Sequence, residues 1–223
     1  MAITAENLAV KYSITREMAD KYSIQSQTRF KAAFDKGIFA QEITPVTVET
    51  RKGAVVVDKD EHPKPDSTLE KLATMKPVFK KDGIVTAAGA SGIVDGAACS
   101  LLMSESKAKE LGLKPLARIV SYASVGCDPT IMGIGPAGAA RLALQKANMK
   151  LEQMDLVEVN EAFAAQYLSV EKELGLDPAK TNVNGGAIAV GHPLGASGTR
   201  IMNHLVYELH PVSYTHLTLP TKA

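Results

Sequence analysis

The sequence has 223 residues, of which 45% are hydrophobic, with 25 lysines and arginines against 24 aspartates and glutamates. This length and hydrophobic fraction allow one domain of ordinary size, or two small ones, with a sizeable core. The near balance of charge gives no electrostatic reason to expect a nucleic acid or an anionic membrane as a partner. The sequence contains no run of about eighteen apolar residues, so no membrane span is predicted. Its first residues, Met1-Ala2-Ile3-Thr4, match neither a secretory signal nor an arginine-rich presequence.

The first ninety or so residues predict helices and one pair of strands. One helix is expected from Thr4 to Val10, and a longer one is expected from Thr15, as its N-cap, to a stop at Gly37. Two strands are expected over residues 43–50 and 54–57. The capping-box pattern Ser67-Thr68-Leu69-Glu70 predicts the start of another helix.

From Gly92 onward, strand and helix patterns alternate, which predicts an α/β layer fold. The predicted strands, which are apolar-rich, cover residues 97–103, 119–123, 156–159 and 181–184. Four helices are predicted in the same region. The first ends at Gly112 and the second begins at Pro136. The third runs from Glu161 to Leu174 and is stopped by Gly175, and the fourth runs from Gly195 to Leu209.

The two cysteines are too few for a disulfide framework or a cysteine metal cluster, and no metal site is predicted. Cys99 lies in the predicted strand 97–103 and is expected to be a small buried hydrophobe. Cys127 precedes Asp128-Pro129 in a predicted turn and is also interpreted as structural.

The most informative stretch is a glycine-rich turn around His192. Five glycines surround this histidine, and Pro193 follows it directly. Glycine allows tight turns and close approach of the backbone to a ligand, and proline fixes the turn. A histidine held on such a turn before a helix is suited to proton transfer near neutral pH. The alternative is a solvated turn with an incidental histidine.

A second candidate, Asn160, follows the predicted strand 156–159 and precedes a predicted helix. Ligand sites in open α/β sheets lie beyond the carboxyl ends of strands, so Asn160 and His192 are expected at one sheet edge, close enough to share a bridging water. The alternative role for Asn160 is that of a helix N-cap.

With both motifs in order, Asn160-Glu161-Ala162-Phe163-Ala164 and Gly185-Gly186-Ala187-Ile188-Ala189-Val190-Gly191-His192-Pro193, the chain resembles the thiolase family. The resemblance extends from Ile3 to about His210. Asp60-Glu61-His62 followed by Ser67-Thr68-Leu69-Glu70 resembles the mitochondrial 3-oxoacyl-CoA thiolase branch.

The resemblance implies a partial thiolase-like fold with mixed sheets layered with helices. Residues 1–89 would belong to a loop domain, and residues 90–115 would close the N-terminal half of the fold. Residues 116–210 would form a truncated C-terminal half. In the tail, residues 211–223, no thiolase counterpart is recognised from the sequence, and this tail is expected to be disordered.

The resemblance also implies the chemistry, which is CoA-dependent thiolytic cleavage of 3-oxoacyl-CoA in fatty acid β-oxidation, in mitochondria. His192 would activate a cysteine nucleophile and, with a water held by Asn160, line an oxyanion hole. Ser91 would contact the pantetheine part of CoA, and Phe163 would line the acyl pocket. CoA would be a co-substrate, with no permanently bound cofactor, and the full-length family member would be a homodimer or homotetramer.

Neither cysteine of this chain stands in a thiolase catalytic motif, so the chain is expected to be a fragment that is inactive by itself. Glu161 is expected to have a structural role, as a negative charge near a helix N-terminus. Two alternatives stay open. One is a non-catalytic thiolase relative that binds acyl-CoA or a partner subunit, and the other is an acetyltransferase specific for acetoacetyl-CoA.

Overall fold

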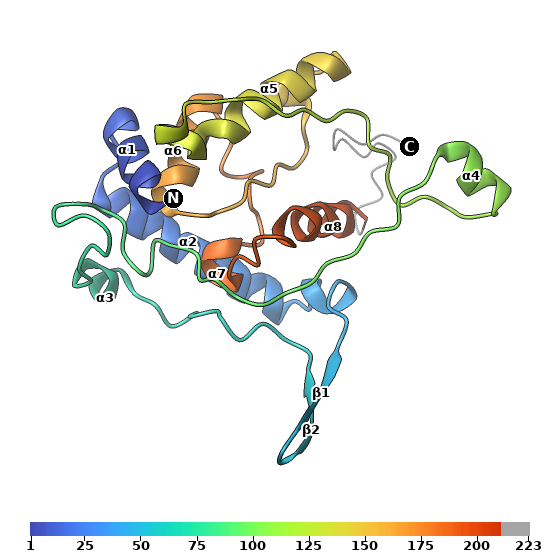
Figure 1. The fold of residues 1–223 in the computed structure, drawn as a ribbon, viewed down its shortest axis with the longest axis horizontal. Coiled ribbons are helices and arrows are strands. Elements are labelled where there is room, and N and C mark those ends of the chain that lie inside the picture. The colour runs from blue at the N-terminus through green and yellow to red at the C-terminus, as the bar shows by residue number, and fades with distance from the viewer. Residues whose placement is uncertain (211–223) are drawn as a thin grey trace.

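A computed structural model describes residues 1–210, and the predicted disordered tail lies outside these described residues. The chain forms a helical body from which one hairpin arm projects (Figure 1). Its α-helices are α1 (Ala2–Tyr12), α2 (Arg16–Asp35), α3 (Leu69–Ala73), α4 (Glu105–Glu110), α5 (Gly135–Ala147), α6 (Ala164–Leu174), α7 (Ala187–Val190) and α8 (Ser197–Leu209). The strands are β1 (Val46–Thr50) and β2 (Gly53–Val57), and the 3₁₀ turns are η1 (Ile38–Gln41), η2 (Pro129–Ile134) and η3 (Leu151–Gln153).

The main core lies where α1 and α2 pack against α6. Every side chain of α6 from Ala164 to Val170 is buried, so this helix is the centre of the body. Tyr22 of α2 stacks on Tyr167 of α6 with ring centroids 4.1 Å apart. Buried aromatic pairs of this kind contribute about 0.5–1.5 kcal/mol beyond the burial of their area.

Most helix ends follow the predicted capping signals. The hydroxyl of Thr15 accepts a hydrogen bond from Met18 N at the start of α2, and Thr68 caps α3 in the same way. Gly37 and Gly175 lie at φ of 72° and 67°, where the left-handed backbone that ends a helix suits glycine. The predicted start at Thr4 is wrong, because α1 already begins at Ala2.

The predicted hairpin is confirmed. β1 and β2 pair antiparallel with Val46 opposite Val57, and the arm extends away from the helices (Figure 1). Every residue of both strands is exposed. The arm is therefore held to the body through the residues at its base.

The predicted strands 97–103 and 119–123 are wrong as paired strands. Both segments lack regular secondary structure, and no other segment among residues 1–210 forms a ladder with them. Leu101 is 82% exposed and Tyr122 is 80% exposed. Cys99 is exposed as well, which corrects the expectation that it is buried. Burial in a sheet needs neighbouring strands, which a local apolar pattern cannot supply.

The other two predicted strands meet at a single point. Val157 forms an isolated parallel bridge with Thr181, where Val157 N donates to Lys180 O and Asn182 N donates to Val157 O. A second isolated bridge joins Ala90 to Phe163. These two bridges hold the segments around residues 90, 160 and 182 against one another, and both candidate motifs lie there.

Candidate active site

Asn160 and His192 are in direct contact, which is closer than the water-bridged arrangement predicted from the sequence. Asn160 Nδ2 lies 3.3 Å from His192 Nε2. Asn160 is positioned by the bridge before it, since its neighbour Val159 donates its N–H to Asn182 Oδ1 at 2.8 Å. The Oδ1 of Asn160 is buried and accepts no hydrogen bond from residues 1–210.

The N-cap alternative for Asn160 is wrong. α6 begins at Ala164 rather than at Glu161, and Phe163 occupies the N-cap position. Three residues therefore separate Asn160 from the helix, and its side chain faces His192 instead of the helix end.

His192 lies on the turn between α7 and α8, and its backbone is held by Gly92. His192 N donates to Gly92 O at 2.8 Å. Gly191 has φ of 89°, and a Cβ at this position would lie 2.5 Å from Val94 Cγ1. Only glycine fits both the left-handed backbone and this close approach.

Ser197 fixes the tautomer of His192. Its Oγ lies 2.6 Å from His192 Nδ1 and donates to Pro193 O at 3.2 Å. Since the hydroxyl hydrogen is used on the carbonyl, Ser197 accepts from an Nδ1–H group. The lone pair of the neutral ring is then on Nε2, the atom that faces Asn160.

The pKa of His192 is lowered by partial burial and, to a lesser extent, by the positive charge of Arg200. The Nε of Arg200 is buried and has no hydrogen-bond acceptor among residues 1–210. A lowered pKa keeps the imidazole neutral at pH 7, which is the form that can accept a proton.

Arg200→Met is expected to raise the pKa of His192 toward its ordinary value of about 6.5, because one of the two causes of the shift is removed. An NMR titration of the His192 ring measures this value. Arg141→Met, which removes an exposed arginine paired with Glu173, is the control and should leave it unchanged. An unchanged or lower pKa in Arg200→Met would contradict the electrostatic account.

Ser91 lies beside this pair through the backbone. Its N–H and its hydroxyl both donate to Ala162 O, at 3.1 and 3.0 Å. The next residue, Gly92, bonds His192. The structure thus places the predicted CoA-contacting residue next to the Asn160–His192 pair, and its binding role stays a prediction.

Phe163 is the partner of Ala90 in the isolated bridge, and its side chain is half-buried. Its ring packs edge-on against the ring of Phe79, with centroids 6.5 Å apart. The predicted role of Phe163 in an acyl pocket is untested by this contact.

Glu161 has a structural position, but not the one predicted. Its fully buried carboxylate accepts hydrogen bonds from Tyr22 Oη and Ser26 Oγ, both at 2.7 Å, and from Ile188 N at 3.0 Å. These donors belong to α2 and α7 rather than to the first turn of α6. The carboxylate therefore ties the Asn160 segment to the helix that precedes His192.

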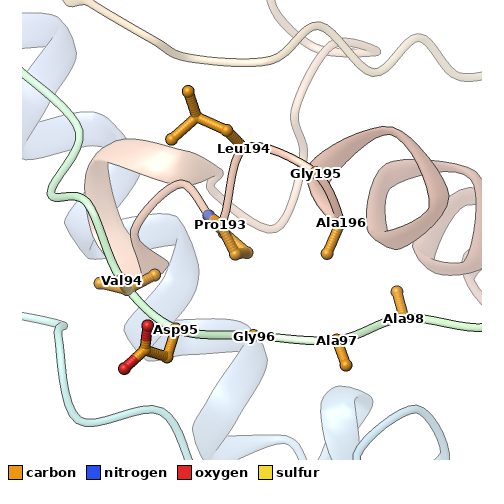
Figure 2. Close-up of a pocket in the computed structure, with 9 residues that line it drawn as sticks. All are labelled: Val94, Asp95, Gly96, Ala97, Ala98, Pro193, Leu194, Gly195 and Ala196. Carbon is orange, nitrogen blue, oxygen red and sulfur yellow. The ribbon is translucent and has the colours of Figure 1, made fainter.

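A shallow groove of about 390 Å³ borders the site, and the sequence did not predict it. Residues 94–98 form one wall and residues 193–196 form the other (Figure 2). Pro193 and Ala196 point toward the facing wall, and Asp95 is the one charged residue of the lining. The groove is therefore bounded by small and mostly apolar groups directly after His192.

Neither cysteine hydrogen-bonds His192 within residues 1–210. The backbone oxygen of Cys99 accepts from Asn203 on α8, and Cys127 lies before η2 with its thiol 3.7 Å from Met132 O. Both thiols are exposed and free.

Residues 1–210 hold no group of three or more His, Cys, Asp or Glu side chains suited to a metal ion. None of the helices up to residue 210 is long and apolar enough to cross a bilayer.

Comparisons with known proteins identify the family that has this fold and this asparagine–histidine pair. Residues 1–106 match the thiolase N-terminal domain, and residues 113–218 match the thiolase C-terminal domain. The chain belongs to the thiolase family. The domain boundaries predicted near residues 89 and 115 remain predictions.

Individual relatives are similar over nearly all of this chain. The mitochondrial 3-ketoacyl-CoA thiolase of Bos taurus is 60% identical over 209 residues, which is 94% of this chain and 53% of the relative. The acetyl-CoA acetyltransferase of Pseudomonas aeruginosa is 58% identical over 210 residues, 94% of this chain and 53% of the relative. The chain thus spans about half the length of these relatives.

Solved structures confirm the predicted α/β thiolase fold. The crystal structure of human mitochondrial 3-ketoacyl-CoA thiolase has a TM-score of 0.89 and 58% identity, covering 95% of this chain and 53% of that one. The same human protein has also been solved in complex with CoA, with a TM-score of 0.87, 56% identity and coverage of 95% and 52%.

Proposed function

We propose that this chain supplies the asparagine–histidine part of a thiolase active site for CoA-dependent cleavage of 3-oxoacyl-CoA. The observation that supports this most strongly is the contact between Asn160 Nδ2 and His192 Nε2, with the tautomer of His192 set by Ser197. In the reaction, a cysteine thiolate attacks the keto carbon, and the bond between the keto carbon and the α-carbon then breaks. The α-carbon takes a proton from an acid group and leaves as acetyl-CoA. The thiol of a second CoA then takes the acyl group and frees the cysteine.

The role of His192 follows from its state. A neutral imidazole with its lone pair on Nε2 can remove the proton of a nearby thiol, and a thiolate is a far better nucleophile than a thiol. The resulting Nε2–H group can then donate to the oxygen on which negative charge develops. Asn160 would hold a water at the same oxygen through its unpaired amide Oδ1.

CoA is the co-substrate and would lie along Ser91, with support from the relative solved with CoA. The names of the relatives from Bos taurus and Homo sapiens support a mitochondrial location. A role in fatty acid β-oxidation is what the thiolase resemblance implies. The oligomer would be a homodimer or homotetramer, as the thiolase resemblance implies.

The test uses a chimera in which this chain replaces the 209 matching residues of the Bos taurus relative. With CoA, the chimera is expected to convert 3-oxooctanoyl-CoA to hexanoyl-CoA and acetyl-CoA, identified by mass spectrometry. The 223-residue chain alone is expected to show no turnover, because neither of its cysteines adjoins His192. If the chimera cleaved acetoacetyl-CoA but not 3-oxooctanoyl-CoA, the acetyltransferase alternative suggested by the Pseudomonas aeruginosa relative would be favoured. A folded chimera without any turnover would contradict the proposal and favour a non-catalytic thiolase relative.

A further inference from the structure

His62, from the Asp60-Glu61-His62 motif, contacts the segment that precedes His192. It follows the hairpin arm in sequence, and its Nδ1 lies 2.8 Å from Ala189 O in α7. A carbonyl oxygen can only accept, so Nδ1 of His62 carries the hydrogen. Ala189 precedes His192 by three residues, which makes this bond a direct link between the base of the arm and the glycine-rich turn.

The opposite edge of the His62 ring lies against Gly92. A Cβ at position 92 would collide with His62 Nε2 and Cδ2, so glycine is required there for the ring to fit. Gly92 O accepts the backbone N–H of His192 at 2.8 Å. The ring of His62 therefore fills the space between α7 and the residue that holds His192.

A second link runs parallel to the first. Lys64 N donates to Gln27 Oε1 at 2.8 Å, and Gln27 Nε2 donates to Ile188 O at 3.2 Å. Residues 62 and 64 thus reach two successive carbonyls of α7, one directly and one through α2. The short helix α7 has only four residues, so these external contacts are a large part of what fixes its position.

We propose that His62 is a positioning residue that holds α7 and Gly92 at the separation that keeps His192 against Asn160. The inference rests on the proposed function for its catalytic meaning. His62 touches neither Asn160 nor the ring of His192 in any hydrogen bond within residues 1–210, so its effect is transmitted through the backbone on both sides of His192.

The first measurement needs no variant. In the unmodified 223-residue chain with ¹⁵N-labelled histidine, His62 is expected to show the Nδ1–H tautomer and His192 the Nδ1–H tautomer as well. An Nε2–H tautomer for His62 is incompatible with its bond to Ala189 and overturns the proposal.

Three variants then separate positioning from general stability. His62→Leu removes the donor, and His62→Asn keeps a donor near the place of Nδ1. His210→Leu removes a histidine that bonds the carbonyl of Leu116 on the surface and serves as the matched control. His62→Leu is expected to raise the pKa of His192, because a looser turn admits water to a ring whose pKa is lowered by burial. His62→Asn and His210→Leu should leave the pKa of His192 equal, within error, to that of the unsubstituted chain. If either of these variants raised the pKa of His192 as much as His62→Leu does, the proposal would be overturned.

Kinetics in the chimera distinguish failure of this inference from failure of the proposed function. His62→Leu is expected to lower kcat by about tenfold with little change in KM, since small misplacements of a catalytic group cost large factors in rate. If His192→Ala abolishes turnover and His62→Leu leaves it unchanged, only the positioning role is refuted. If His192→Ala leaves turnover intact, the proposed function itself fails.

Discussion

Replacing His192 by alanine in the chimera is expected to lower kcat by at least about 10²–10³-fold, the usual cost of removing a single oxyanion donor. The loss of kcat should lie at the upper end of this range or beyond it, because the same ring would both activate the thiol and donate a hydrogen bond to the oxyanion. His210→Ala is the control, since His210 is exposed and its ring contacts the carbonyl of Leu116. The measurement is steady-state thiolysis of 3-oxooctanoyl-CoA.

A pH profile sharpens this prediction. Since burial and Arg200 lower the pKa of His192, the rate that depends on its neutral form should persist below pH 6.5 and fall only when the lowered pKa is reached. Retention of more than about a tenth of the original kcat in His192→Ala would be incompatible with a general base.

Asn160→Ala is expected to lower kcat by about 10²–10³-fold while leaving the thermal stability of the chimera nearly unchanged. Within residues 1–210 the side-chain amide hydrogen-bonds His192 alone and caps no helix, so the fold loses little without it. Asn203→Ala is the matched control. Asn203 lies on α8, bonds the backbone of Cys99 and the side chain of Ser100, and makes no hydrogen bond to Asn160 or His192 within residues 1–210. A large fall in melting temperature with an unchanged kcat would instead assign Asn160 a structural role.

The parts of the fold that the sequence predicted well are determined by near neighbours. Thr15 and Thr68 cap their helices, and Gly37 and Gly175 adopt the left-handed backbone that ends a helix. Each of these outcomes depends on residues within one helical turn, so a local pattern is sufficient to predict it.

The start of α6 shows why local patterns fail elsewhere. A carboxylate next to a predicted helix suggested a role for Glu161 in the first turn. The buried donors of Tyr22 and Ser26, more than 130 residues away in sequence, bind that carboxylate instead. The chain from Asn160 to Phe163 therefore stays outside the helix, and the amide of Asn160 faces His192.

The predicted strands around Cys99 and Tyr122 failed for a related reason. An apolar run indicates a segment that would be buried in a sheet, but pairing depends on neighbouring strands that residues 1–210 do not provide. His62 was equally hidden, because its contacts with Ala189 and Gly92 arise only when the base of the arm meets α7. The motif around His62 marked a family branch without indicating a physical role.

A double-mutant cycle in the chimera measures whether Asn160 and His192 act as one catalytic pair. Residues that act as a unit show strongly non-additive effects on rate. For one pair, Asn160→Ala combined with His192→Ala is expected to lower kcat little further than the more damaging single substitution. Effects that multiply, so that the double variant is slower by the product of the two single factors, would show independent roles and contradict the pairing.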